Sequence, residues 1–463
     1  MSRARAVGFY GWTFTMAMLI LANLAFLGCF DSGDDGGEND GDVSTDGDRL
    51  DGDEPDGDEP DGDDPSDGDG EEVVADPLPF SPAGPEATPD PFEKGPFPVG
   101  VKTYTFYDTS RKGENEGEGR RLKVDVWYPA RQQYKDGPFW KLDMIAESQG
   151  EDLGDRRAEL ESYGFPEFDT ELVRDAEPDI GNGPYPVILF SHGANGIRFQ
   201  SVFYTTHLAS HGYVVAAPDH LFNTLWDILR DGYSEASVIA SAPDRPKDMS
   251  FLLDRLTEMN DDPENPFYRS MDLENVGITG HSFGGFTSVA TPCNDERFKV
   301  SVPHSPVISM AVIFGCTLEE YPVPIMVMGG TKDNTLRYYD QYCEYGMIKG
   351  SPKYLYELVG GGHFTFSDMC RLDLETMAEE MDFGDAAHAL GDGCSPTDNV
   401  PYVEAQTTIN YYGTAMFNWQ LRGSEGSKEL LDDRDDPPFD TVNFYEGDVP
   451  DWSGPEGSCG WEE

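Results

Sequence analysis

The sequence predicts an α/β protein with a mostly parallel central sheet, helices on both faces and an N-terminal antiparallel hairpin. Two observations predict this class. From Tyr185 onward, short continuous apolar runs recur between stretches of helical periodicity, as expected of strands buried on both faces of a parallel sheet. Before them, Val101–Asp108 and Leu122–Pro129 alternate like strands on either side of a Gly/Glu-rich loop, which predicts the hairpin.

The chain is strongly acidic, and its N-terminal part is the most acidic. Its 463 residues carry a formal net charge of −56, and residues 31–76 contain 22 acidic residues and one basic residue. A five-residue repeat over 51–65, Asp-Gly-Asp-Glu-Pro and a close variant, has no apolar side chain to bury, so we predict a disordered spacer over 29–84. Calcium binding is the alternative, although the spacing does not fit an EF-hand loop. Such an acidic surface repels phosphates, so we expect no nucleic-acid partner.

The first residues are organised like a targeting segment. Arg3 and Arg5 precede an apolar stretch, Trp12–Leu27, which is short for a membrane span. The stretch ends in Phe26-Leu27-Gly28-Cys29, which resembles a bacterial lipobox, with Phe26 where an aliphatic residue is usual. We therefore expect 1–28 to be a lipoprotein signal peptide and Cys29 to be lipidated. The protein would then be exported and held on the bacterial cell envelope, at the outer membrane or cell surface. The alternatives are an ordinary secretory signal and a single anchor helix.

The elements of the domain are expected in chain order over 85–423. After the hairpin, 131–184 is polar, with a short helix near Arg156–Ser162, and is predicted as an insertion that covers the site or forms a surface excursion. Strands are predicted at Pro186–Ser191, Tyr213–Ala217, Val276–Thr279, Lys299–Pro303, Pro324–Gly329 and Tyr354–Val359, and helices at Gln200–Ser210, Pro246–Met259 and Thr408–Gln420. An acidic tail, 424–463, follows, with little core-forming pattern beyond Phe439–Tyr445.

A sharp turn behind one of these strands carries a candidate nucleophile. Gly280-His281-Ser282-Phe283-Gly284 follows the strand directly and matches the pattern Gly-x-Ser-x-Gly. In this pattern a strand turns tightly into a helix and holds the serine in a strained, exposed position. Glycine is needed on both sides because a side chain there would collide with neighbouring backbone. We therefore predict Ser282 as a catalytic nucleophile.

Candidates for the base and the acid follow later strands. His363 lies in a glycine-rich loop after Tyr354–Val359, and Asp333 ends the loop after Pro324–Gly329. The aspartate can hold the far nitrogen of the histidine and so fix its tautomer. The competing histidines are His220 and His304, which also end strands but precede the expected place in chain order. The competing acids are Asp340 and Asp368.

An oxyanion that forms during acyl transfer needs hydrogen-bond donors. We expect the backbone N–H of Phe283 and one N–H from the loop Ser191–Gly196, which is rich in glycine, to supply them. Ala194 is the predicted second donor.

Six cysteines remain if Cys29 carries lipid. An even number in an exported chain suggests disulfides, and the sequence does not choose among the fifteen pairings that six cysteines allow. They are Cys293, Cys316, Cys343, Cys370, Cys394 and Cys459. No pair has metal-finger spacing, and we expect neither a metal nor a cofactor.

Several stretches resemble the platelet-activating factor acetylhydrolase and dienelactone-hydrolase-like branch of the α/β-hydrolases. They are Val124–Ala130, Pro186–Gly193, Leu208–His220 and Gly280–Gly285. The chain order Ser, Asp, His is also the order of α/β-hydrolases. The resemblance implies a secreted serine hydrolase of short acyl or oxidised-lipid esters, with Ala194 and Phe283 in the oxyanion role.

The chain also departs from these families. In the animal acetylhydrolases the acid follows the strand after the nucleophile, where this chain has His304-Ser305-Pro306. Asp333 matches the later position of bacterial dienelactone-hydrolase-like proteins and polyester hydrolases, and the true dienelactone hydrolases use cysteine. The expected function is a serine carboxylesterase that acts on a small ester or lipid. The alternatives are a polyester or cutin-type hydrolase and an inactive binding lipoprotein on the same fold.

Overall fold

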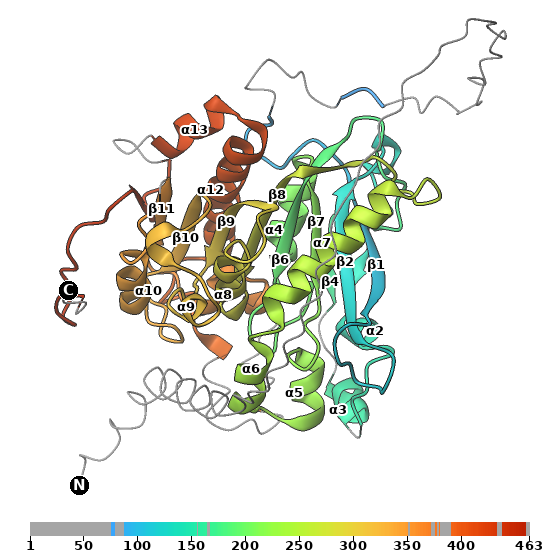
Figure 1. Cartoon of the computed structure of the whole chain (residues 1–463), viewed down its shortest axis with the longest axis horizontal. Helices are drawn as coiled ribbons and strands as arrows, with labels where there is room; N and C mark the ends of the chain where they lie inside the picture. The colour runs from blue at the N-terminus through green and yellow to red at the C-terminus, as the bar shows by residue number, and fades with distance from the viewer. Residues whose placement is uncertain are drawn as a thin grey trace, which may run out of the picture. The chain divides into compact units, whose positions relative to one another are not determined.

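A ten-stranded sheet runs through the centre of the protein in this computed structural model (Figure 1). The structure describes residues 76–78, 88–154, 156–163, 167–350, 352–371, 376, 379, 390–432 and 438–459. The strands of the sheet are β1 (Val99–Asp108), β2 (Arg120–Pro129), β5 (Leu172–Arg174), β6 (Tyr185–Ser191), β7 (Val214–Pro218), β8 (Met271–His281), β9 (Phe298–His304), β10 (Ile325–Gly330), β11 (Lys353–Leu358) and β12 (Val442–Glu446).

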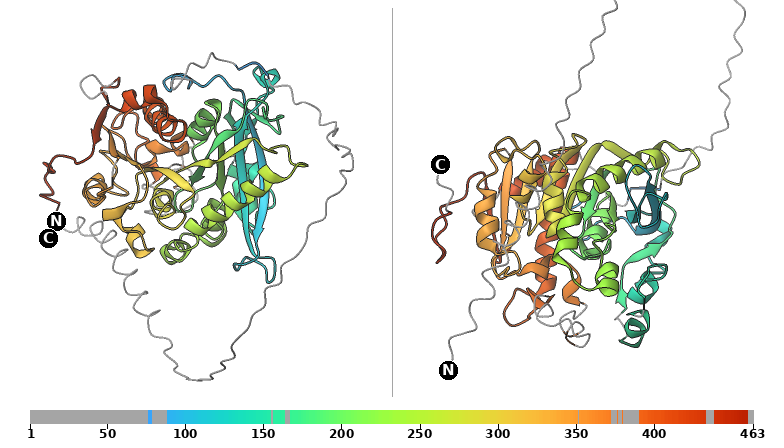
Figure 2. Two further views of the ribbon diagram at one scale, coloured as in Figure 1. Left: turned by 45° about the horizontal axis from the view of Figure 1, so that its top comes forward. Right: turned by 60° about the horizontal axis from the view of Figure 1, so that its bottom comes forward.

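The sheet is mostly parallel, as predicted. Its order is β12-β11-β10-β9-β8-β6-β7-β2-β1-β5, and the run from β11 to β7 is parallel throughout. Strands β1 and β2 form the expected antiparallel hairpin, with Val99 opposite Pro129 and Asp108 opposite Arg120. Figure 2 shows this hairpin and the C-terminal strand towards opposite edges of the sheet.

Helices pack on both faces of the sheet, and each face has its own core. The larger helices are α4 (Val202–Ser210), α7 (Arg245–Asp261), α8 (Phe283–Ala290), α10 (Tyr338–Tyr345) and α12 (Tyr402–Arg422). Side chains of β6 alternate between the two cores: Ile188 and Phe190 join the core that contains α4 and α12, whereas Val187 and Leu189 join the core that contains α7. This alternation explains why the strand is apolar at each position from Pro186 to Phe190.

The segment 131–184 is more closely integrated into the domain than the sequence suggested. It forms β3 (Lys141–Leu142), α2 (Met144–Glu147), α3 (Arg156–Tyr163), β4 (Phe168–Asp169) and then β5, which pairs in parallel with β1 and forms the edge of the main sheet. Leu142, Met144 and Leu172 are all buried in the core. These apolar pieces are too short to show a periodicity, so the sequence pattern indicated only a polar insertion.

The C-terminal stretch differs in a similar way from the acidic tail that the sequence suggested. Helix α13 (Glu425–Asp432) buries Leu431 against the core, and β12 pairs antiparallel with β11, with Val442 opposite Leu358. Residues after 423 therefore complete the opposite edge of the sheet. Strand β12 is half exposed and overlaps Phe439–Tyr445, the stretch of this tail in which the sequence showed a core-forming pattern.

Three disulfides confirm the expectation from the even number of cysteines. The pairs are Cys293–Cys316, Cys343–Cys459 and Cys370–Cys394. Cys343–Cys459 ties the end of the chain to α10.

The predicted signal peptide, Cys29 and the acidic repeat lie outside the described residues. Within the described part of the chain, no helix has both the length and the apolar character needed to cross a membrane. Asp76, in the predicted spacer, contacts the domain through an ion pair with Arg131 at 3.0 Å.

Candidate active site

Three of the predicted residues meet at one edge of the sheet because each follows the carboxyl end of a parallel strand. Ser282 follows β8, Asp333 follows β10 and His363 follows β11. The carboxyl ends of parallel strands lie at the same edge, so loops from distant parts of the chain converge there. The edge therefore brings together side chains that are up to 81 residues apart in the sequence.

The turn that carries Ser282 has the strained geometry predicted for it. Ser282 adopts φ 60° and ψ −116°, which is rare for a residue with a side chain, and its N–H donates to the carbonyl of His304 at 2.8 Å. A Cβ atom at Gly280 would lie 2.5 Å from the carbonyl oxygen of Ser191, and one at Gly284 would lie 1.8 Å from it. Both glycines are therefore required for the turn to pack against β6.

His363 joins the serine to the aspartate. Its Nε2 lies 2.9 Å from Ser282 Oγ, and its Nδ1 lies 2.8 Å from Asp333 Oδ2. The carboxylate is itself held by two further donors, the N–H of Leu336 at 2.8 Å and the side-chain amide of Gln341 at 3.0 Å. His363 and Asp333 are buried, whereas Ser282 is partly exposed. A carboxylate at Nδ1 leaves Nε2 free to accept the proton of the serine.

The charge of Asp333 controls the protonation of this histidine. Burial by itself lowers the pKa of His363, but the Asp333 carboxylate outweighs that effect and, with help from Asp392, raises the pKa above its usual value of 6.5.

Activity should therefore depend on pH with a definite sign. Protonated His363 cannot accept a proton, so kcat/KM should fall as pH drops through its pKa, and the midpoint should lie above 6.5 because that pKa is raised. The measurement is kcat/KM for a soluble ester across pH, with chemistry shown to limit the rate. A flat profile between about pH 5 and 8 would argue against a histidine base.

None of the competing residues bonds to Ser282 through its side chain in the described part of the chain. His220 and His304 are fully buried, and His220 bonds to Ser191 and Asp248 instead of Ser282. Asp340 pairs with Arg337. Asp368 accepts the N–H of Phe203 in the first turn of α4.

The two predicted oxyanion donors are Phe283, which follows Ser282 directly, and Ala194, in the loop after β6. Phe283 opens α8, and the first N–H groups of a helix have no partner inside it. In the loop after β6, the N–H of Gly193 is already bound to Gln200 Oε1 at 2.9 Å. Ala194, the next residue, is exposed. The role of Ala194 as the second donor stays a prediction.

Sequence reasoning missed two residues that connect His363 with the loop Ser191–Gly196, which we call the oxyanion loop after its predicted role. Gln200 accepts from Gly193 and donates through Nε2 to His281 Nδ1 at 2.7 Å, and His281 Nε2–H donates to the carbonyl of His363 at 2.9 Å. Because a carbonyl only accepts, these partners assign the His281 tautomer. Burial, then the neighbouring His363, lowers the pKa of His281 well below 6.5, so it stays neutral. Its position inside the turn motif was the available signal, but its partners are distant in sequence.

Asp392 connects the loops of the acid and the base. Its Oδ2 accepts the N–H groups of Asn334 at 2.9 Å and Thr335 at 2.8 Å, just after Asp333, and its carbonyl accepts the N–H of Phe364 at 2.8 Å, just after His363. The Cys370–Cys394 disulfide closes the segment that carries Asp392.

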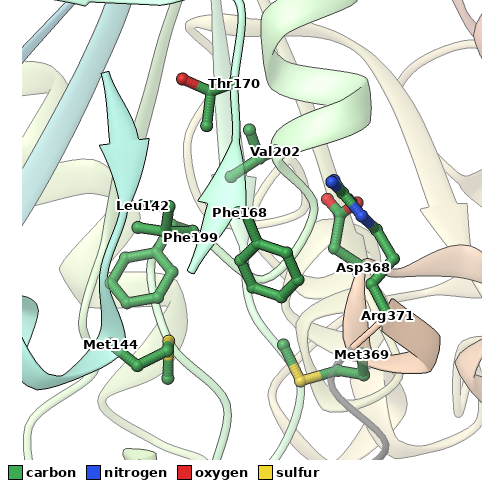
Figure 3. A pocket seen from close by; sticks show the side chains of 9 residues that line it. All are labelled: Leu142, Met144, Phe168, Thr170, Phe199, Val202, Asp368, Met369 and Arg371. Atoms are coloured by element: carbon green, nitrogen blue, oxygen red, sulfur yellow. Dashed lines mark hydrogen bonds and ion pairs between the residues drawn. The ribbon is translucent and has the colours of Figure 1, made fainter. Parts of the chain in front are cut away.

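An apolar pocket lies beside these loops (Figure 3). In the figure, Asp368 and Arg371 lie side by side across from Leu142 and Phe199. The residues that line it are Leu142, Met144, Phe168, Thr170, Phe199, Val202, Asp368, Met369 and Arg371. The segment 131–184 thus supplies one wall. On the opposite wall, the N–H of Asp368 donates to the carbonyl of Gln200 at 2.9 Å, and the side chain of Gln200 in turn bonds to Gly193 of the oxyanion loop. In the described residues, no three His, Cys, Asp or Glu side chains are grouped as metal ligands.

Parts of the chain match known families. The model for platelet-activating factor acetylhydrolase, isoform II, matches residues 86–224, and the model for chlorophyllase matches residues 176–328.

Curated relatives match over limited lengths. Chlorophyllase type 0 from Chenopodium album is 28% identical over 31% of this chain and 38% of that protein. Platelet-activating factor acetylhydrolase from Bos taurus is 28% identical over 26% of this chain and 34% of that protein. A probable 1-alkyl-2-acetylglycerophosphocholine esterase from Arthroderma benhamiae is 26% identical over 46% of this chain and 57% of that protein. The matches thus span from about a third to somewhat over half of these relatives.

A solved structure matches much more of the chain. The ferulic acid esterase from Streptomyces cinnamoneus superposes with a TM-score of 0.54 at 22% identity, over 75% of this chain and 96% of that chain. At this identity the likeness shows a shared fold.

Proposed function

We propose that this chain, which has the α/β-hydrolase fold predicted from its sequence, is a serine-dependent carboxylic ester hydrolase that works through an acyl-enzyme. One observation carries the proposal: Ser282, His363 and Asp333 form a continuous chain of hydrogen bonds behind a strained turn at the carboxyl edge of the sheet. Esterase relatives that match parts of the chain support the same class of reaction.

The geometry leads to a two-step mechanism. His363 Nε2 takes the proton of Ser282 as its Oγ attacks the ester carbonyl, and the Asp333 carboxylate stabilises the imidazolium that forms. The N–H groups of Ala194 and Phe283 bind the oxyanion of the tetrahedral intermediate. His363 then protonates the departing alcohol. Water, activated by the same histidine, releases the acid and restores Ser282.

The proposed substrates are esters with a short acyl group or a lipid-like part. The names of the relatives point to an acetyl group in two cases. A polyester or cutin-type substrate is the alternative, which we base on the position of Asp333 after β10.

A fluorophosphonate probe tests the reaction class, because it modifies an activated serine covalently. We expect one equivalent of label on Ser282 in the purified protein. An absence of label, together with no turnover of any nitrophenyl ester in a series of rising chain length, would instead favour an inactive binding lipoprotein. The chain length with the highest kcat/KM identifies the acyl preference.

We also propose that Cys29 carries lipid and that the acidic spacer holds the domain away from the membrane. A thioether-linked diacylglycerol supplies two acyl chains, which is enough for stable anchoring, whereas one chain gives only marginal binding. The proposal rests on the segment before Cys29, which resembles a lipobox.

Cys29→Ser should release the domain from the membrane or leave it unprocessed, with the esterase reaction unchanged. Fractionation and mass spectrometry of the mature N-terminus make the measurement, and Cys293→Ser/Cys316→Ser is a control that leaves residue 29 intact. A soluble wild-type protein that begins elsewhere and lacks lipid mass would contradict the proposal.

A further inference from the structure

A second chain of Ser, His and Asp hydrogen bonds lies buried beside the oxyanion loop. Ser191 ends β6, and its Oγ lies 2.9 Å from Nε2 of His220, which follows β7. His220 Nδ1 lies 2.8 Å from Oδ2 of Asp248 on α7. In both networks the histidine bonds to the serine through Nε2 and to the aspartate through Nδ1, and the distances are the same as those among Ser282, His363 and Asp333. The side chains of Ser191, His220 and Asp248 are all fully buried, however, so this second network of hydrogen bonds has no access to a substrate.

The charges around His220 hold it in one protonation state. Burial, then the charge of Arg245, lowers the pKa of His220 to about 3. Burial alone raises the pKa of Asp248, but the bonds from Arg120, at 2.7 and 2.8 Å, and from His220 bring it below its usual value. His220 is therefore neutral, donates from Nδ1–H to Asp248 and accepts a hydrogen bond from the hydroxyl of Ser191 at Nε2.

This network continues into the backbone of the oxyanion loop. The N–H of His220 donates to His192 Nε2 at 3.0 Å, and His192 Nδ1–H donates to the carbonyl of Gly193 at 2.7 Å. Helix α5 (Leu225–Asp231) holds the other end of the oxyanion loop, because the N–H of Leu225 donates to the carbonyl of Gly196 at 2.9 Å. Ala194, the proposed donor, thus lies between two anchored glycines.

Arg245 connects the two halves of the proposed oxyanion hole. Its guanidinium is fully buried and donates to the carbonyl of His192, to Ser191 Oγ at 3.3 Å and to Asn223 Oδ1 at 2.5 Å. The same guanidinium lies 4.8 Å from the ring centroid of Phe283, the residue that provides the other donor. One buried side chain therefore contacts both the oxyanion loop and the first residue of α8, whose N–H groups must point at one oxygen atom.

We propose that His220 and Arg245 are positioning residues that set the direction of the Ala194 and Phe283 N–H groups in the oxyanion hole. The inference rests on the proposed function, since it assumes that an oxyanion forms beside Ser282. Neither residue touches the substrate. Each acts through the backbone of the oxyanion loop, where a small rotation removes a hydrogen bond to the transition state.

The test compares an ester with the matching thionoester. Sulfur is a weak hydrogen-bond acceptor, so an enzyme with a well-aligned oxyanion hole favours the oxygen ester strongly. Arg245→Lys keeps the charge but cannot hold all of its partners, so kcat should fall about 10- to 100-fold, with KM nearly unchanged. The preference for the oxygen ester should fall along with kcat, while the pH midpoint set by His363 stays in place.

The matched control is Arg297→Lys, the same change at an arginine that pairs with Asp254 and Asp295 and is 38% exposed. It should leave both kcat and the oxygen-to-sulfur preference at wild-type values. Ser191→Ala and His220→Asn are gentler changes that carry the test if Arg245→Lys does not fold, as judged by its thermal transition.

Two results would overturn the proposal. One is a loss of kcat in these variants with the oxygen-to-sulfur preference intact, which would indicate a purely structural role. The other is activity within twofold of wild type in every folded variant. Failure of the proposed function gives a different result, in which Ser282→Ala itself remains active.

Discussion

Ser282→Ala should abolish nearly all ester hydrolysis and leave the fold intact. The change removes the Oγ atom that lies 2.9 Å from His363 Nε2, and losses of such nucleophiles typically lower kcat by about 10⁴- to 10⁶-fold. Alanine also has a Cβ, so the strained backbone at φ 60° is no less tolerable than with serine. Single-turnover kinetics and fluorophosphonate labelling are the measurements.

The matched control for this variant is Ser237→Ala, at an exposed serine on α6 (Glu235–Ser241). It should show wild-type kcat and full labelling. If Ser282→Ala kept activity within tenfold of wild type, the proposed nucleophile, and with it the mechanism, would be incorrect.

Asp333→Asn should have the second largest effect and lower kcat by about 10⁴-fold, because it favours the wrong tautomer of His363. Asp333 Oδ2 accepts from Nδ1 at 2.8 Å, whereas an asparagine amide can donate to that nitrogen and leave the proton on Nε2. A histidine with a proton on Nε2 cannot accept one from Ser282. We expect a smaller loss than for Ser282→Ala, since the nucleophile remains.

Asp340→Asn is the control for this prediction, because Asp340 ion-pairs with Arg337 in the first turn of α10. It should change kcat less than twofold. A larger loss from Asp340→Asn or Asp368→Asn than from Asp333→Asn would mean that a different acid serves the histidine. The thermal transition of each variant separates this outcome from unfolding.

The parallel strands and the candidate site residues were predictable because their signals are local. A strand buried on both faces is apolar along its length, and Pro186–Phe190 shows this directly in its sequence. The turn around Ser282 requires glycine at two fixed positions, so five consecutive residues identify it. Asp333 and His363 could be placed because they follow such strands in chain order. Their hydrogen bonds agree with that placement.

Local signals failed where an element is short or half exposed. Strand β5 has three residues, too few to show a period, and the apolar pattern at Phe439–Tyr445 did not identify β12 as a strand of the main sheet. Each becomes a strand because β1 or β11 offers a row of backbone partners at the edge of the sheet.

The sequence by itself therefore determined the class of fold, the turn at Ser282 and the loops that carry Asp333 and His363. Only the tertiary structure decided which groups hold those loops in place: Gln200 with His281, Asp392 between two loops, the disulfide pairs, and Arg245 between His192 and Phe283. The physical reason is that each of these contacts joins residues far apart in the chain. A buried polar group must find a partner, but nothing near it in the sequence says which one, because the packing of the strands makes that choice.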